Sequence, residues 1–233
     1  VVTLGTPISL VVENRDWDNL SDRMSAFGNA PDAMKREVAP RPGHADLVGV
    51  LKNNSDDCRN VLERASARET AARVAAAGIA KELLAALGVE VFSYVVSIGS
   101  AQWDETDPYM SAARYNPADI EFSEVRCPSV EASERMKKMI DVARLQGESL
   151  GGTFRVVATG LVPGLGDFDA GPSRLTSKLG AAIFGIPAIK GVEFGMGFHA
   201  SRESGSNVHD VITHAGDRGF TRATNNAGGL EGG

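Results

Sequence analysis

The chain has 233 residues, of which 42% are hydrophobic, and its formal net charge is −6 at pH 7. This length and apolar content suit a globular protein with a sizeable core. The negative charge argues against broad binding to nucleic acid or to a membrane surface, and no apolar run is long enough to span a bilayer. Cys58 and Cys127 lie far apart without metal-ligand spacing, so we expect free thiols in a reducing cytosol.

Both ends of the sequence resemble cut points. The opening residues 1–5 lack the basic region of a secretory signal and begin as if inside a strand, and residues 228–233 stop in a glycine-rich loop. We therefore expect an internal piece of a longer protein.

The N-terminal region predicts little regular structure. Residues 8–13 read as a strand, and residues 18–37 read as a loop with one short helical turn. Pro40, Pro42 and Gly43 then disfavour regular structure and expose the backbone. Such a connection often carries function because a rigid scaffold presents it.

The strongest secondary-structure signal is a helix over residues 67–87. Ser66 and Glu69 predict a capping box at its start, and Gly88 supplies its stop. Apolar residues recur at helical spacing along one face. Because alanine covers much of the remaining circumference, we expect this helix to be buried between layers.

The rest of the chain alternates predicted strands and helices. The expected elements are a strand over 89–99, a helix over 132–146, a strand over 153–162, a helix over 174–184 capped by Ser173, a strand over 188–194 and a polar, mobile tail over 201–222. This order suits an α+β fold in which sheets cover helices. No segment has the composition of a linker, so we expect one domain over residues 1–233.

Two segments, residues 41–46 and 64–70, place a histidine and three arginines near the start of the alanine-rich helix. A helix N-terminus favours anions, and we expect Arg64 and Arg68 to share one rather than to form a merely solvated surface. His44 is the candidate for proton transfer, because the neighbouring Asp46 could orient its imidazole and raise its pKa. A solvated or structural histidine is the alternative.

Other chemistries have weaker signals. His209, Asp210 and His214, together with the 41–46 segment, could suggest a metal phosphohydrolase, but the spacing of the two histidines does not suit one helix face. The glycine pairs lack the context of a dinucleotide fold or a P-loop. No nucleophile elbow is present.

Taken together, these motifs resemble the chorismate synthase family. The resemblance rests on five motifs in the family's order: Arg-Pro-Gly-His-Ala-Asp at 41–46, Arg-Ala-Ser-Ala-Arg-Glu-Thr at 64–70, Lys-Gly-Val-Glu at 190–193, Gly-x-Gly-Phe at 195–198 and Thr-Asn-Asn-Ala-Gly-Gly at 224–229. It covers the whole chain but only the middle of the family's length.

The resemblance implies a reaction: 1,4-anti elimination of phosphate from 5-enolpyruvylshikimate 3-phosphate to give chorismate, with reduced FMN and no net redox change. It implies that His44 is catalytic and supplies a proton to reduced flavin or leaving phosphate. The other implied site residues are Arg41 and Arg68 for substrate, and Arg64, Ala65, Ser66, Pro187, Ala188 and Gly232 for FMN.

The implied fold is a β-α-β sandwich with helices between antiparallel sheets, assembled as a cytoplasmic homotetramer. The resemblance implies no metal and no nucleic-acid or membrane partner. It associates NADP with the family and leaves the source of the flavin reductant open. The family's second active-site histidine, its C-terminal flavin loop and its catalytic aspartate are absent from this sequence. The alternative is therefore an inactive structural or oligomer-forming core.

Overall fold

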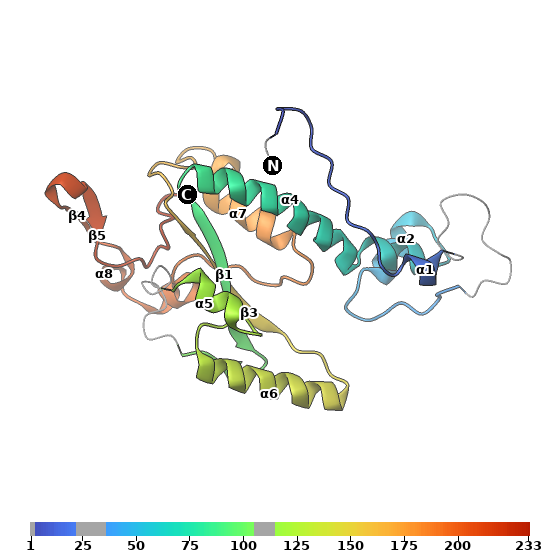
Figure 1. Cartoon of the computed structure of the whole chain (residues 1–233). Helices are drawn as coiled ribbons and strands as arrows, with labels where there is room; N and C mark the ends of the chain where they lie inside the picture. The colour runs from blue at the N-terminus through green and yellow to red at the C-terminus, as the bar shows by residue number, and fades with distance from the viewer. Residues whose placement is uncertain (1–2, 22–35, 105–114) are drawn as a thin grey trace. The chain divides into compact units, whose positions relative to one another are not determined.

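The structure is a computed structural model that describes residues 3–21, 36–104 and 115–233 (Figure 1). The chain divides into two compact units, Val1–Leu83 and Leu84–Gly233. Most of the segment expected as loop, residues 18–37, lies outside the described residues. None of the helices described combines the length and the apolar character that a membrane crossing requires.

The first unit is helical in the part that the structure describes. Its elements are α1 (Trp17–Leu20), α2 (Asp46–Asn53), α3 (Arg59–Arg64) and most of α4 (Ala67–Ala86). The predicted strand over residues 8–13 is wrong: these side chains are exposed and the backbone has no regular secondary structure. Apolar composition alone does not make a strand, because a strand needs a neighbour to bond with its backbone groups.

The predicted alanine-rich helix is confirmed as α4, but its expected capping box does not form. Ser66 Oγ accepts the amide of Arg68, the second helical residue, at 3.2 Å. The Ser66 amide donates to the Glu63 carbonyl at 3.4 Å, and the Glu69 carboxylate instead accepts Arg73 Nε at 2.7 Å. The helix therefore has a simple N-cap bond and neither of the two reciprocal bonds of a capping box.

The expectation that α4 is buried between layers is wrong for this chain. None of its residues is buried, and Val74 and Leu83 are 66% and 65% exposed. Helical periodicity identifies the apolar side of a helix but not whether this chain supplies what covers it.

The second unit is organised around an antiparallel sheet with strand order β2-β1-β3 (Figure 1). Its strands are β1 (Glu90–Ile98), β2 (Ala101–Gln102) and β3 (Gly152–Thr159). The register of β1 with β3 runs from Glu90 opposite Thr159 to Ile98 opposite Gly152, with an irregularity between Val95 and Ser97. These strands confirm the predictions made for residues 89–99 and 153–162 to within a few residues.

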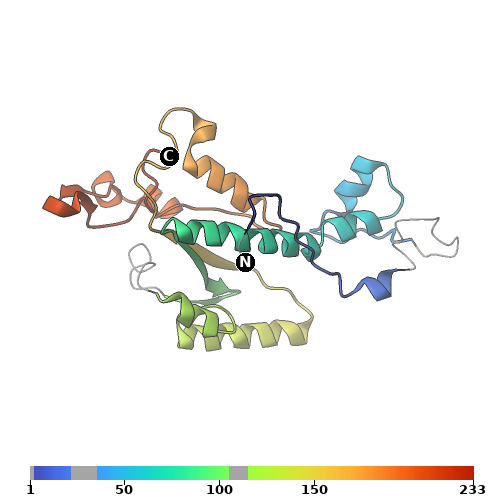
Figure 2. The same ribbon diagram turned by 45° about the horizontal axis from the view of Figure 1, so that its top comes forward.

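The core of the second unit lies where α6 (Val130–Gln146) packs next to β1 and β2 (Figure 2). Ser129 caps α6 by accepting the Ala132 amide, and Gly147 ends it in the left-handed region. One buried cluster comprises Ala101, Cys127, Ala132 and Met136. A second comprises Phe92, Tyr94 and, from α5 (Pro117–Phe122), Ile120.

The C-terminal region is built from short elements and differs from its prediction at two points. The elements are η2 (Gly171–Ser173), α7 (Leu175–Phe184), η3 (Gly197–Arg202), α8 (Gly205–Val208), β4 (Ile212–His214), η4 (Gly216–Arg218) and β5 (Phe220–Arg222). Ser173 does not cap α7, whose N-cap is Arg174 without a side-chain bond. The tail expected to be mobile contains α8 and the antiparallel β4–β5 hairpin.

The strand predicted over residues 188–194 is also wrong. Ala188 has a φ of 68°, in the left-handed region, and the following residues up to Phe194 have no regular secondary structure. A left-handed residue cannot belong to an extended strand. The fold is thus mixed α/β with small antiparallel sheets.

Candidate functional site

The segment 41–46 is a turn that leads directly into α2. Gly43 has a φ of 73°, which a residue with a side chain adopts only with strain. Arg41 holds the end of the turn: its Nε donates to Asp46 Oδ2 at 2.9 Å and its Nη2 donates to Asp46 Oδ1 at 3.1 Å. The Arg41 backbone amide adds a third bond to Oδ2 at 3.0 Å. We call this set of bonds the Arg41–Asp46 clamp.

The clamp fixes the charge of Asp46. The side chain is only 2% exposed, so burial favours its neutral form. The Arg41 guanidinium and the Arg41 amide outweigh burial and lower the pKa of Asp46 from 3.8 to about 2. Asp46 is therefore a carboxylate at neutral pH, fully engaged by Arg41.

His44 lies at the exposed tip of this turn. Its Nδ1 is 3.0 Å from the Pro42 carbonyl oxygen, and because a carbonyl can only accept, Nδ1 carries the proton. Nε2 is then the nitrogen that can take up or release a proton. The expectation that Asp46 orients the imidazole is wrong, because the bidentate fork of Arg41 occupies that carboxylate and the Pro42 carbonyl orients the ring instead.

Arg68 has more partners than the sequence suggested. In α4 it donates to Asp16 Oδ2 at 3.1 Å and also pairs with Glu63. Its guanidinium is 38% exposed, so an incoming anion would compete with two carboxylates. Arg68 is therefore held by two carboxylates before any anion arrives.

Arg64, Ala65 and Ser66 form the connection between α3 and α4. Ala65 is the C-cap of α3, and Ser66 caps α4. Arg64 is exposed and makes no ion pair with any residue that the structure describes. Its guanidinium is the one in this connection that is available to an anion.

The remaining predicted site residues lie in the second unit. Pro187 and Ala188 form an exposed turn after α7. Gly232 has a φ of 78° and nothing within 4 Å of where a Cβ would stand, so its backbone is open. The predicted residues thus fall into two groups, with His44 and the arginines in the first unit and these three in the second.

The residues weighed for a metal site have other contacts. Asp210 accepts hydrogen bonds from Thr224, Asn226 and Ala227, and the His214 ring lies edge-on to Phe220. Within the described ranges, no group of three or more His, Cys, Asp or Glu side chains could hold a metal ion.

Sequence reasoning missed the roles of several carboxylates. Asp16 and Glu63 were not expected to engage Arg68, and Glu231 was not expected to pair with Arg222. A usable signal for the last pair was the opposite charges that flank a glycine-rich loop. No local pattern connects Asp16 to Arg68.

An exposed histidine in the turn before α2 and exposed arginines at the connection into α4 give this mixed α/β chain side chains of the kind that bind anions. Comparison with known proteins agrees and is more specific: the family model for chorismate synthase matches residues 1–233. The chain belongs to the chorismate synthase family.

Individual relatives agree with this assignment. The chain is 50% identical to chorismate synthase of Symbiobacterium thermophilum over 99% of its own length and 60% of the relative's. It is 47% identical to that of Bacillus subtilis with the same coverage. The chain spans about 60% of the length of these curated relatives.

A solved structure shares the fold. It is described as the crystal structure of chorismate synthase and superposes with a TM-score of 0.77 at 43% identity. The match covers 81% of this chain and 58% of that one. The mixed α/β architecture with small antiparallel sheets is therefore that of the family.

Proposed function

We propose that this chain is the catalytic middle of a chorismate synthase, which eliminates phosphate from 5-enolpyruvylshikimate 3-phosphate to give chorismate. The observation that carries the proposal is the Arg41–Asp46 clamp, which presents an exposed His44 in a chain of this family. The clamp fixes the base of the turn, and the Pro42 carbonyl holds Nδ1 of the His44 ring. This arrangement is suited to proton transfer, because the ring is oriented while its Nε2 stays free.

The residues assigned to FMN have the chemistry that its phosphate and its flat ring require. Arg64 offers an exposed guanidinium to the phosphate, and the open backbone at Gly232 can lie against a flat ring. Pro187 and Ala188 add an exposed, uncharged turn. When bound in its reduced form, FMN supplies electron density to the substrate during elimination and recovers it afterwards.

The arginines of the first unit bind and orient the anionic substrate in this proposal. A guanidinium has five N–H donors, and Arg41 uses two on Asp46, so the others remain for substrate. Arg68 exchanges a carboxylate partner for the substrate's own anionic group. Because the Asp16 side chain is 52% exposed, giving up that partner costs little.

His44 moves a proton at Nε2. The protonated imidazole can donate to an oxygen of the departing phosphate, and the neutral ring can accept a proton at the same atom. The Pro42 carbonyl keeps Nδ1 protonated in both states. Either reduced flavin or phosphate is the partner in this transfer.

We further propose the family's assembly and location for the chain. The two units are parts of one domain with helices between antiparallel sheets, in a cytoplasmic homotetramer. A single family model across residues 1–233 supports one domain. The exposed apolar residues of α4 support further layers of packing, and Cys58 and Cys127 are not joined in a disulfide, which agrees with a reducing compartment.

The test is an FMN absorbance titration of the chain with and without 5-enolpyruvylshikimate 3-phosphate. A flavin spectral shift that strengthens with substrate, together with chorismate formation, is the expected result. The His44→Asn variant should keep the shift and lose product formation. A folded chain that shifts no flavin spectrum contradicts the proposal.

A second candidate function is that of a structural core without its own active site. This candidate predicts that the folded chain does not shift the flavin spectrum. The observation in its favour is that α4 carries Val74, Ile79 and Leu83 with 42–66% exposure. Sedimentation velocity on the same sample separates the two candidates. An assembly that binds no FMN supports the structural core.

A further inference from the structure

Asp210 collects three hydrogen bonds from one short stretch of the loop after β5. Its Oδ1 accepts Thr224 Oγ1 at 2.5 Å and the Asn226 amide at 2.7 Å. Its Oδ2 accepts the Ala227 amide at 2.9 Å. One side chain that precedes the β4–β5 hairpin therefore determines the path of the backbone that follows it.

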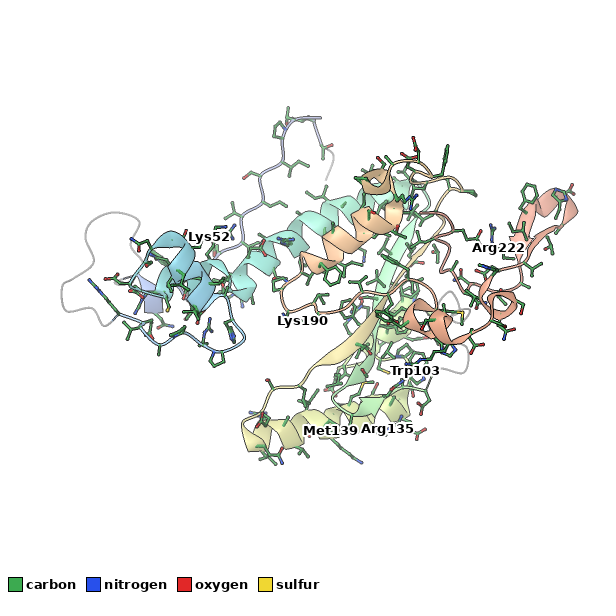
Figure 3. The ribbon with its side chains drawn as sticks, turned by 180° about the vertical axis from the view of Figure 1, so that it is seen from behind. Lys52, Trp103, Arg135, Met139, Lys190 and Arg222 are labelled. Atoms are coloured by element: carbon green, nitrogen blue, oxygen red, sulfur yellow. The ribbon has the colours of Figure 1, made fainter. Side chains whose placement is uncertain are left out.

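The two ends of the same loop are joined by an ion pair. Arg222 is the last residue of β5, and its Nε and Nη2 each lie 2.6 Å from a different oxygen of Glu231. Figure 3 labels Arg222 at this end of the hairpin. This bidentate pair closes the segment 223–230 at its base, while Asp210 binds it from within.

The loop is also attached to the rest of the second unit. The Met196 amide donates to the Asn226 carbonyl at 2.7 Å. Gly195 and Gly228, both with positive φ, lie so close that a Cβ on either would meet the backbone of the other. At the far end, the Gly233 carbonyl accepts the Leu175 amide at the start of α7.

Asp210 is charged in this setting. Burial would raise its pKa, but the hydrogen bonds from Ala227, Thr224 and Asn226 outweigh burial and hold the pKa below its ordinary value. An asparagine here could offer only one oxygen, and its NH2 group would face an N–H donor. Leaving such donors unpaired costs more than the bonds themselves contribute.

We propose that Asp210, assisted by the Arg222–Glu231 pair, is a positioning residue that pre-orders the loop of residues 223–231, which leads directly to the proposed FMN contact Gly232. This inference rests on the proposed function, in which Gly232 contacts FMN. Glycine-rich backbone loses much conformational entropy when a ligand orders it. A segment ordered before binding avoids that cost, so its ligand binds more tightly.

The test compares Asp210→Asn with a matched control, Asp217→Asn, which alters an exposed aspartate in η4 of the same hairpin. Amide hydrogen exchange of residues 224–229 is measured first, without FMN. We expect exchange at Asn226 and Ala227 to accelerate about 10- to 100-fold in Asp210→Asn, the range for loss of charge-assisted bonds. The control should exchange like wild type.

FMN affinity is measured next by absorbance titration. The dissociation constant should rise by a similar factor, about 10- to 100-fold, in Asp210→Asn and not in the control. Unchanged exchange and unchanged affinity in a folded Asp210→Asn variant would overturn the inference. If that variant does not fold, Thr224→Val removes one donor at nearly constant volume, and it should shift both readouts in the same direction by less.

The two proposals can fail separately. A wild-type chain that binds no FMN overturns the proposed function and the flavin part of this inference. The exchange data then still decide whether Asp210 orders the loop. Wild-type FMN binding with normal loop protection in both Asp210→Asn and Thr224→Val overturns only the positioning role.

Discussion

Arg41 and Asp46 form a bidentate ion pair across the turn that carries His44, and the carboxylate is 2% exposed while the guanidinium is 47% exposed. The pair therefore anchors the turn on one side and leaves arginine N–H groups accessible on the other. A single arginine can thus fix the loop and still meet an anion.

The lowered pKa of Asp46 predicts how the stability of the first unit depends on pH. The folded pKa, about 2, lies below the ordinary value of 3.8, so the stabilisation is fully present above about pH 4 and is lost as pH falls through 2. Carbon-13 NMR titration of the carboxyl group measures this pKa directly. In Arg41→Gln the midpoint should return toward 3.8, and an unchanged midpoint would contradict the clamp.

Replacing His44 by asparagine should separate binding from proton transfer. The Asn side-chain amide can still donate to the Pro42 carbonyl, but it offers nothing at the position of Nε2. We expect product formation to fall by about 10²- to 10⁴-fold, the contribution of a general acid or base, with FMN affinity unchanged. His214→Asn, in the exposed strand β4, is the control.

Alanine at two glycines of the first unit should have opposite effects. A Cβ at Gly49 of α2 would overlap the side chain of Val61 in α3, whereas a Cβ at Gly78 of α4 meets nothing within 4 Å. Gly49→Ala should destabilise by about 1–3 kcal/mol through overpacking. Gly78→Ala should stabilise by about 0.5–1 kcal/mol, because glycine is costly inside a helix. Urea denaturation measures both, and equal effects would contradict the packing of α2 on α3.

Truncating Met136 should damage the core of the second unit. Met136 is fully buried on α6, whereas Leu145 of the same helix is 89% exposed. Met136→Ala should lower the free energy of unfolding by about 2–5 kcal/mol. Leu145→Ala should change it by no more than about 0.5 kcal/mol. Thermal unfolding followed by circular dichroism provides the comparison, and similar melting temperatures would show that α6 is not packed as described.

Elements with strong local signals were predictable from the sequence. The helices α4 and α6 have clear periodicity and stop signals, and β1 and β3 are long apolar strands between glycines. The short helices α2 and α3 were missed because their N-caps, Ala45 and Cys58, make no side-chain cap bond. The side chain that accepts an amide at the start of α3 is Asp57, whose Oδ1 accepts the Arg59 amide at 2.9 Å, one residue before the N-cap.

The two wrong strands and the altered site contacts depend on the tertiary structure. Residues 8–13 have strand-like composition without a bonding partner, and Ala188 is left-handed for reasons that its own side chain does not encode. At the site, the motif identified His44 and Arg41 correctly as neighbours. The sequence does not decide whether Asp46 bonds with the His44 imidazole or with the Arg41 guanidinium, because both residues lie within five positions of it. Only the folded geometry decides this.

The pairing of β1 with β3 also has a consequence for how the second unit folds. These strands are sequence-distant, because α5 and α6 lie in the connection of residues 99–151 between them. Closing so long a connection costs chain entropy before any strand bond forms, which makes such sheets slow to assemble. Early formation of α6, whose caps are local, would shorten the effective connection. During synthesis, the edge of β1 that pairs with β3 therefore stays unpaired until β3 has emerged, and this interval is when the chain is most exposed to aggregation.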